Sequence, residues 1–301
     1  MSQKIAVIGA GNVGSTIVYT LMLKNLSSQI ILIDINEKKE KGEVLDIADS
    51  LCFVETGCVK GGDWHDAQDA DLIILTAGIA QKPGETRLQL TQKNKEVAKS
   101  IFKKIGKIKK TAVVIVVSNP VDVITYIVQQ ACKLPKNQIF GSGTSLETAR
   151  LRTTLSHHLK VNAQSIEGYA LGEHGDSGFI AWSTVNVGGS PISKFIKTDK
   201  ELNAIEKKVK NEVYEIIKRK GATFFGIAAV VSDIVEAVIY NQRKVMPVST
   251  RLSNFNGVSG VCLSVPAIVG HKGVEKVWPL KLTPDEKKKF QASAKKIKQY
   301  L

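Results

Sequence analysis

Short, continuous apolar runs alternate with longer stretches of helical periodicity through the first half of the chain. Residues 112–117 are apolar at every position, which is typical of a strand buried on both faces of a parallel sheet. In residues 93–110, apolar side chains recur at helical spacing and lysines fill the opposite side. Further short runs predict strands at residues 5–8, 30–33, 72–75 and 138–140. This alternation predicts right-handed crossovers and a doubly wound parallel sheet.

The pattern changes after about Gly141. We predict a helix at residues 146–159, strand-like runs at 166–171 and 179–187, a long helix at 200–220, and a β-rich stretch with turns at 247–266. No repeat, low-complexity segment or flexible linker separates the two halves. The sequence therefore predicts an α/β domain at residues 1–142, followed by a mixed α+β domain at residues 143–301 that shares a large interface with it.

Composition narrows the class of protein. With 301 residues, 43% of them hydrophobic, the chain can bury a substantial core. No apolar run reaches the length of a membrane span, and no signal-peptide pattern precedes the first strand. The cysteines form no CxxC pair, which favours buried free thiols over a disulfide framework or a zinc site: Cys52, Cys58, Cys132 and Cys262. We predict a cytoplasmic protein with no membrane partner and no bound metal.

The net charge of +14 raises the question of nucleic-acid binding. The lysines, however, fall on several solvated helix faces, and no aromatic side chains are interleaved with them for base stacking. We therefore expect no nucleic-acid partner; such binding, if present, would weaken steeply with salt. A positive field of this kind also attracts small anionic substrates.

A glycine-rich turn joins the first strand to an apolar helix. The strand at residues 4–8 runs into Gly9-Ala-Gly11-Asn-Val-Gly14, and Asp34 follows twenty residues later at the end of the second strand. Gly9 permits the tight turn, Gly11 lets the backbone approach a pyrophosphate, and Gly14 allows close helix–strand packing. Asp34 would accept hydrogen bonds from ribose hydroxyls and repel a 2′-phosphate. A Rossmann-type domain that prefers NAD over NADP is therefore predicted, although glycines alone could also serve only as turns.

One histidine lies in a polar turn after an apolar run. The segment 169–177 reads Tyr-Ala-Leu-Gly-Glu-His-Gly-Asp-Ser, with His174 between two glycines. Histidine is the side chain whose ordinary pKa suits proton transfer near neutrality, and small neighbours let a substrate approach it closely. A lone histidine is more often structural or solvated, so its partners must decide.

Four motifs, the last of them within this histidine turn, occur in a characteristic order. They are Thr76-Ala-Gly78-Ile-Ala-Gln81-Lys-Pro-Gly-Glu-Thr-Arg87, Ser118-Asn119-Pro120-Val-Asp122, Leu146-Glu147-Thr-Ala-Arg150 and Gly172-Glu-His174-Gly. This order and spacing resembles the L-lactate/malate dehydrogenase family over nearly the whole chain, and most closely its lactate branch. The resemblance implies a Rossmann-type NAD domain followed by an α+β catalytic domain. It also implies reversible hydride transfer between NADH and a small 2-keto acid, with pyruvate and L-lactate as the expected pair.

The resemblance assigns roles that suit this chemistry. His174 is the expected proton donor for reduction and the base for oxidation. Arg150 would clamp the substrate carboxylate bidentately. Arg87 would reach the carbonyl oxygen, where negative charge develops, when the polar loop before it closes. Taken from the sequence alone, Arg150 could instead form a surface salt bridge and Arg87 could be solvated.

Other positions resemble the lining of the substrate and cofactor pockets. Asn119 follows the strand at residues 112–117 and would hydrogen-bond the substrate carbonyl region or His174, although Asn-Pro is also an ordinary turn. Thr223 resembles a substrate-lining residue, although a plain buried helix would give the same pattern. The expected cofactor contacts are Gly9, Gly11, Asn12, Val13, Gly14, Asp34, Thr76, Ala77, Gly78, Val117, Asn119 and Ile227.

Gln81 is expected to determine the choice of substrate. In malate dehydrogenases the matching position is an arginine that pairs with the second carboxylate of oxaloacetate. A neutral glutamine cannot form that pair, so closing the loop over oxaloacetate would bury an unpaired charge. Pyruvate carries a methyl group there, which favours it as substrate. A malate or broader 2-hydroxyacid dehydrogenase is the alternative.

The chain departs from the family pattern at the partner of the histidine. The family normally has an aspartate three residues before the anchoring arginine, and here the residue is Glu147. A carboxylate is kept at this position, so we predict that Glu147 pairs with His174. The protein should then retain activity, at a rate reduced by the extra methylene group of the glutamate. A dinucleotide-binding regulator that has lost catalysis is the alternative from a different class of protein.

A second departure concerns regulation. In family members activated by fructose 1,6-bisphosphate, an arginine and a histidine form the basic pair that binds the effector; the matching residues here are Arg152 and Glu167. Glutamate would repel a phosphate, so we expect no strong activation. We expect no arm before the first strand, and we expect a homo-oligomer, a tetramer or a dimer, formed by helix packing.

Overall fold

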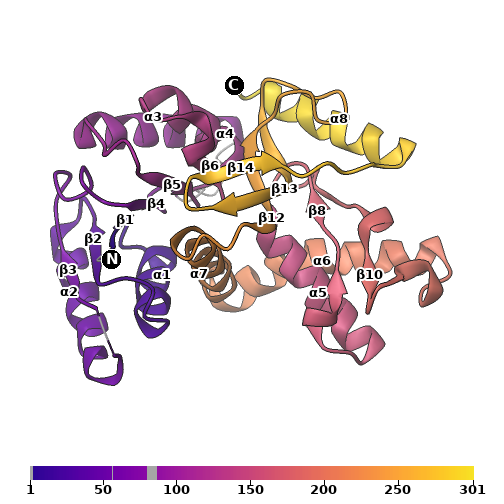
Figure 1. Ribbon diagram of the computed structural model, residues 1–301, viewed down its shortest axis with the longest axis horizontal. Helices are drawn as coiled ribbons and strands as arrows, with labels where there is room; N and C mark the ends of the chain where they lie inside the picture. Colours follow the sequence, from indigo (N-terminus) through magenta and orange to yellow (C-terminus); the bar gives the residue numbers. More distant parts are fainter. Residues whose placement is uncertain (1–2, 56, 80–86) are drawn as a thin grey trace.

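The computed structural model describes residues 3–55, 57–79 and 87–301, and within them the chain forms one nine-stranded sheet. Six parallel strands run in the order β3-β2-β1-β4-β5-β6, and three antiparallel strands, β12, β13 and β14, continue the sheet beyond β6 (Figure 1). The parallel strands are β1 (Lys4–Ile8), β2 (Gln29–Ile33), β3 (Val59–Gly61), β4 (Leu72–Leu75), β5 (Val113–Val116) and β6 (Ile139–Gly141). The antiparallel ones are β12 (Lys244–Arg251), β13 (Cys262–Gly270) and β14 (Gly273–Val277). The predicted doubly wound α/β fold is confirmed.

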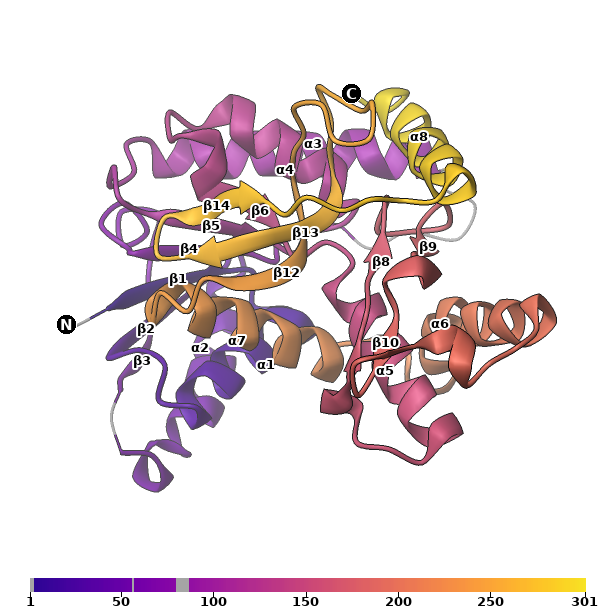
Figure 2. The same ribbon diagram turned by 45° about the vertical axis from the view of Figure 1, so that its right-hand side comes forward.

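Helices cover both faces of this sheet, as Figures 1 and 2 show. One face carries α1 (Asn12–Leu23), α2 (Glu37–Ala48) and α7 (Phe225–Ile239), and the other carries α3 (Arg87–Ile105) and α4 (Val121–Ala131). Alternate residues of each strand point to opposite faces. In β1, Ile5 and Val7 therefore pack toward α1 and α7, whereas Ala6 and Ile8 pack toward α3 and α4. The parallel strands are apolar at consecutive positions because both faces are buried.

The second half of the chain builds two smaller cores beside the sheet. Helices α5 (Ser145–Leu159) and α6 (Asp199–Lys220) pack together over short strands, and α8 (Pro284–Lys298) packs against β13 and α4. The short strands are β7 (Ile166–Glu167), β8 (Ala170–Leu171), β9 (Phe179–Ile180), β10 (Asn186–Val187) and β11 (Ser190–Pro191). Strand β12 pairs with β6, so the two halves of the chain share one sheet. The boundary between residues 142 and 143 stays a prediction.

The elements differ from the sequence predictions where apolar runs are short or interrupted. Strand β3 is not predicted, because only Val59 of its three residues is buried. The predicted run 166–171 divides into β7 and β8 at Gly168, whose φ of +137° breaks the extended chain. The predicted mobile loop before Arg87 falls largely on residues 80–86, outside the described residues.

The thiols are less buried than the sequence predicts. All four cysteines are free, and Cys262 is buried. Cys132 is half-buried, whereas Cys52 and Cys58 are exposed, so the prediction of buried thiols is wrong for these two. Both exposed residues lie in the connection from α2 to β3, at the edge of the sheet, where there is little core to cover them.

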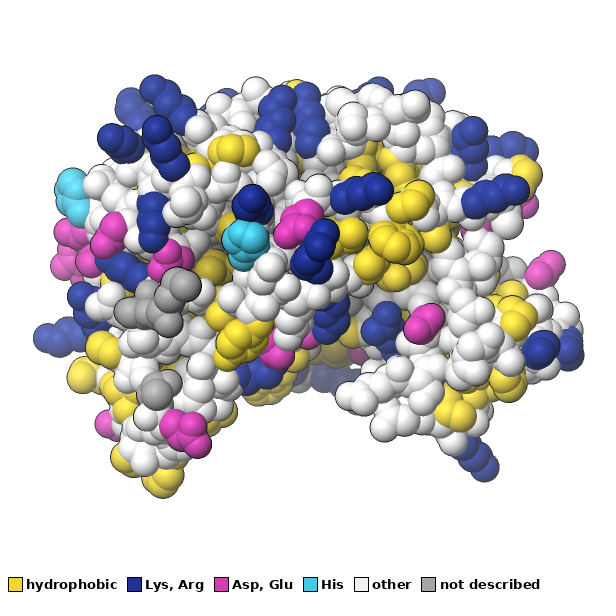
Figure 3. Space-filling view, in the orientation of Figure 1, with side chains coloured by type: hydrophobic (Ala, Val, Ile, Leu, Met, Phe, Trp, Pro, Cys, Tyr) yellow, Lys and Arg dark blue, Asp and Glu magenta, His cyan; other side chains and the backbone are white. Residues whose placement is uncertain are grey.

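Lysine and arginine side chains are spread over the face seen in Figure 3, with acidic side chains among them, and do not gather into one stripe. Several are paired: Lys4 with Asp69, Lys244 with Asp233, and Arg243 with Glu275. In the described part of the chain, no helix is both long and apolar enough to cross a membrane.

Candidate active site

The glycine-rich turn after β1 is held against the end of β2. The Asp34 carboxylate accepts a hydrogen bond from the Ala10 backbone N–H at 2.7 Å through Oδ2, and from the Asn36 N–H at 2.8 Å through Oδ1. The Gly9 N–H donates to the Ile33 carbonyl at 2.8 Å. Asp34 and the turn, which the sequence predicts to share a ligand, therefore lie side by side at the carboxyl edge of the sheet, where ligands of such sheets bind.

The ends of β1, β4 and β5 are joined by side-chain hydroxyls. Thr76 Oγ1 lies 2.9 Å from the Ile8 carbonyl and 3.0 Å from the Gly9 carbonyl. Ser118 Oγ donates to the Ala77 carbonyl at 2.6 Å. The predicted cofactor contacts of residues 76–78 and 117–119 are thus fixed to the glycine-rich turn, so that the three loops form one surface.

Asn94 connects two of these loops and is not found by sequence reasoning. It is buried on α3, where its Oδ1 accepts from the Ile79 N–H at 2.7 Å and its Nδ2 donates to the Asn119 carbonyl at 2.9 Å. A buried amide with these partners holds the chain on both sides of the site. Nothing in the local pattern of α3 distinguishes Asn94 from a solvated polar residue.

The glycine-rich turn fits a bound phosphate. Helix α1 begins after Gly11, which acts as its N-cap without a side-chain hydrogen bond to the first turn. The first N–H groups of a helix lack partners within the helix and carry partial positive charge. A side chain built on Gly11 would meet no atom within 4 Å among the described residues, so space for an anion lies in front of these donors.

His174 lies in the turn between β8 and β9, and its backbone is fixed on two sides. The preceding Gly172 has a φ of +89°, which favours glycine, and exchanges backbone hydrogen bonds with Ser264 of β13 at 3.1 and 3.0 Å. The His174 N–H donates to Asp122 Oδ2 at 2.8 Å. The turn thus presents the imidazole from a rigid backbone.

The predicted contact between His174 and Glu147 is present. Nδ1 of the ring lies 3.1 Å from a carboxylate oxygen of Glu147, which projects from the first turn of α5. Burial disfavours a charged ring, but the charge and hydrogen bond of Glu147, with the charge of Asp122, outweigh it and raise the pKa of His174 to about 9. In return, the cationic ring overcomes burial and holds the pKa of Glu147 below its ordinary value.

Asp122 is a further charged group beneath the histidine that the sequence analysis leaves without a role. It is 1% exposed, and its Oδ1 accepts from the Ser249 hydroxyl at 2.6 Å. Burial raises the pKa of Asp122 to about 6, although its hydrogen bonds and the nearby His174 oppose this. The signal is an aspartate directly after the Asn-Pro pair at the end of a strand predicted to be buried.

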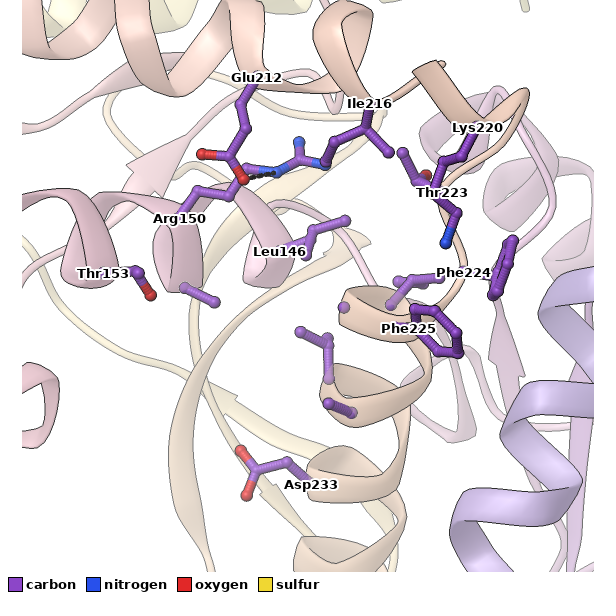
Figure 4. A pocket seen from close by; sticks show the side chains of 15 residues that line it. Leu146, Arg150, Thr153, Glu212, Ile216, Lys220, Thr223, Phe224, Phe225 and Asp233 are labelled. Atoms are coloured by element: carbon purple, nitrogen blue, oxygen red, sulfur yellow. Dashed lines mark ion pairs between the residues drawn. The ribbon is translucent and has the colours of Figure 1, made fainter. Parts of the chain in front are cut away.

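Arg150 faces a cavity of about 620 Å³ between α5, α6 and the start of α7. Its side chain is 8% exposed, and its guanidinium lies between two carboxylates, with Nη1 3.9 Å from Glu147 and Nε 3.6 Å from Glu212. Thr223, predicted to line the substrate pocket, lies on the same cavity (Figure 4). Ile227, predicted to contact the cofactor, lines this cavity too. The structure thus brings Arg150, Thr223 and Ile227 together, and Glu147 joins them to His174.

The side chains of two predicted site residues lie outside the described part of the structure. Gln81 lies outside the described residues, and Arg87 is described only as the first residue of α3. Their expected roles in substrate choice and carbonyl polarisation stay predictions. No group of three or more His, Cys, Asp or Glu side chains in the described part of the chain could hold a metal ion.

A sheet edge suited to a dinucleotide, next to an imidazole–carboxylate pair and a buried arginine, suits an oxidoreductase that acts on a small anionic substrate. The family models agree. The lactate/malate dehydrogenase NAD binding domain matches residues 3–141, and the α/β C-terminal domain of that family matches residues 144–301. The chain therefore belongs to the lactate/malate dehydrogenase family, whose members are NAD-dependent oxidoreductases.

Individual relatives are similar to the chain over nearly its full length. An L-lactate dehydrogenase of Acetivibrio thermocellus is 42% identical over 305 residues, covering 99% of this chain and 96% of the relative. One of Clostridium botulinum is 41% identical, covering 100% and 96%. The ligand-bound crystal structure of the minor L-lactate dehydrogenase from Enterococcus mundtii gives a TM-score of 0.96 at 38% identity, covering 99% of this chain and 97% of that one.

Proposed function

We propose that the protein is an NAD-dependent L-lactate dehydrogenase, which interconverts pyruvate and L-lactate. The observation that carries this proposal is the cluster of His174, Glu147 and Arg150: a proton carrier with its carboxylate partner, next to a buried cation on the wall of a cavity. Reduction of a 2-keto acid needs a proton donor and a carboxylate anchor close together, and these side chains supply both.

The residues at the sheet edge suit NAD as the cofactor. Bound there, NADH supplies the hydride and NAD accepts it. The first N–H groups of α1 would bind its phosphates, and Asp34 would accept hydrogen bonds from a ribose and disfavour a 2′-phosphate. Asp34 already accepts two backbone N–H donors, which keeps its carboxylate in place for this role.

Each chain residue then has one task in the reaction. His174 delivers a proton to the carbonyl oxygen in reduction and removes it in oxidation, while Glu147 holds the ring and stabilises its charged form. Arg150 binds the substrate carboxylate. Arg87, by family resemblance, would stabilise charge on the carbonyl oxygen. Glu147 can orient the ring as the aspartate of other family members does. Its longer side chain still places a carboxylate oxygen 3.1 Å from Nδ1 of His174, which is a hydrogen-bond distance.

The raised pKa of His174 predicts opposite pH profiles for the two directions. Because the protonated ring is the donor, kcat/KM for pyruvate should be level below the pKa of about 9 and fall above it. Lactate oxidation needs the neutral ring, so its kcat/KM should rise as pH increases through the same value. Steady-state rates in both directions between pH 6 and about 10.5 test this.

Glu147→Gln is the matched variant for this prediction. It keeps the size of the side chain but removes the charge, so the pKa governing both profiles should fall toward or below the ordinary histidine value of 6.5. Profiles that do not move in this variant would contradict the role of Glu147.

The proposed function is tested by following NADH oxidation with pyruvate and oxaloacetate in parallel. We expect kcat/KM for pyruvate to exceed that for oxaloacetate by about a thousandfold, because Gln81 leaves the second carboxylate of oxaloacetate unpaired. Preference for oxaloacetate would overturn the specificity assignment in favour of a malate dehydrogenase. Binding of NADH without turnover of any 2-keto acid would instead support a non-catalytic NAD-binding role.

Assembly and location are proposals of the same kind. Large apolar side chains are exposed at and beside α2, where Ile35 is 81%, Leu45 61% and Phe53 83% exposed. Exposed apolar side chains gathered in one region support contact with another subunit. We propose a homo-oligomer in the cytoplasm that uses this face.

A further inference from the structure

Glu212 is a carboxylate on the wall of the proposed substrate cavity that has no part in the mechanism above. It projects from α6 toward Arg150 of α5, and its Oε1 lies 3.6 Å from Nε of the guanidinium (Figure 4). Both side chains line the same cavity. The cation proposed to anchor the substrate therefore has an internal carboxylate beside it.

The other charges of the cavity are engaged elsewhere, so Glu212 acts on Arg150. The Lys220 ammonium lies over the rings of Phe224 and Phe225, at 3.6 and 4.1 Å from their centroids. Asp233 is paired with Lys244 at 2.7 Å. Arg150 thus remains as the cation for an incoming carboxylate, and Glu212 is the acidic side chain of the cavity nearest to it in the described chain.

The charge balance around Arg150 opposes anion binding. The Arg150 cation lies between Glu147 and Glu212, and Glu147 is also paired with the cationic His174. Before substrate enters, these two positive and two negative groups sum to zero, and the Asp122 carboxylate, whose charge also acts on His174, adds a further negative charge. A substrate carboxylate adds a further negative charge within a few ångströms of Glu212, where a partly buried site screens the repulsion poorly.

We propose that Glu212 sets the substrate affinity of the site: it engages Arg150 in the resting enzyme and competes with the substrate carboxylate for it. The inference rests on the proposed function, since it concerns how strongly that site binds a 2-keto acid. Glu212 is 40% exposed and Arg150 only 8%. The carboxylate can therefore move into solvent when substrate binds, while the guanidinium stays in place. The competition raises KM and leaves the reacting groups unchanged.

The test compares Glu212→Gln with Glu215→Gln, which removes the same charge one turn further along α6. Glu215 is 59% exposed and pairs with Arg219, away from the cavity. In Glu212→Gln we expect KM for pyruvate to fall about tenfold, with kcat within about twofold of the wild type, since one nearby charge is removed. Glu215→Gln should match the wild type. Glu212→Asp, which keeps the charge, should stay closer to the wild type than Glu212→Gln.

A binding measurement separates this inference from the proposed function. Oxamate, the unreactive amide isostere of pyruvate, is titrated calorimetrically into each protein saturated with NADH. Its dissociation constant should be about tenfold lower in Glu212→Gln. Because the Glu212 side chain is 40% exposed, its ion pair with Arg150 contributes little to stability, and the Tm of this variant should stay within about 2 °C of the wild type.

Each outcome has one meaning. Wild-type turnover of pyruvate with unchanged KM and oxamate binding in Glu212→Gln overturns the inference alone. So does a variant in which kcat falls while KM stays the same. Absence of pyruvate turnover by the wild type, with tighter oxamate binding in the variant, overturns the proposed function and retains the competition. Oxamate binding to neither protein overturns both.

Discussion

Replacing His174 with asparagine should lower kcat/KM for pyruvate about a thousandfold, because asparagine cannot carry the proton that the carbonyl oxygen needs. The amide keeps the polarity and roughly the size of the ring, so Glu147 retains a hydrogen-bond partner. His174 also lies on the turn between β8 and β9, apart from the glycine-rich turn and Asp34. The dissociation constant of NADH should therefore stay within about twofold of the wild type.

His158→Asn is the matched control for this variant. His158, near the end of α5, forms a similar pair with Glu201 of α6, with Nε2 2.9 Å from the carboxylate, but both side chains are 41% exposed. This variant should retain full activity. Stopped-flow and steady-state measurements of NADH oxidation compare the two variants. Loss of less than about tenfold in His174→Asn would contradict its role as proton donor.

The parallel sheet could be predicted because a strand buried on both faces is a continuous apolar run in the sequence. Residues 112–117 are apolar throughout, and β5 forms there with Val113–Val116 buried. Strand β3 has no such apolar run, since Lys60 is exposed and Gly61 is only half-buried at the sheet edge. The pairing of β12 with β6, which makes one sheet of the two halves, depends on contacts about a hundred residues apart in the chain that no local pattern encodes.

In the candidate site too, residues within local motifs could be predicted, whereas contacts between distant helices could not. His174, Glu147 and Arg150 belong to motifs whose spacing could be read, and the structure brings them into contact. Glu212 could not be assigned a partner, because its contact with α5 arises only when two helices pack. Its position three residues after the buried Val209 did carry a signal: an acid on the apolar stripe of α6.

Replacing Gly14 with alanine should damage both the fold and cofactor binding. A Cβ at Gly14 would lie 1.8 Å from the Gly9 carbonyl oxygen and 2.8 Å from Thr76 Oγ1. The closest atom belongs to the backbone, so α1 must move away from the end of β1. Overpacking of this kind costs about 2–3 kcal/mol of the free energy of unfolding. The Tm measured without NADH should fall by about 5–10 °C, and the displaced N–H groups should bind NADH poorly.

Gly11→Ala separates cofactor binding from packing. A Cβ at Gly11 would meet no described atom within 4 Å, and the φ of −80° suits alanine. The fold should accept it, with Tm unchanged within about 2 °C. The methyl group would nevertheless occupy the space proposed for the pyrophosphate, so the dissociation constant of NADH should rise about a hundredfold through lost charge-assisted hydrogen bonds.

Gly42→Ala in α2 completes the set, since a Cβ there also meets no described atom within 4 Å and the residue lies outside the glycine-rich turn. It should leave the dissociation constant of NADH unchanged and raise the Tm slightly, because alanine favours a helix interior. Calorimetric titration of NADH and thermal unfolding of the three variants decide the matter. If Gly11→Ala bound NADH as tightly as Gly42→Ala does, the phosphates would not lie over the start of α1. Gly11 would then be needed only for the backbone turn, which is the alternative interpretation of the glycine-rich sequence.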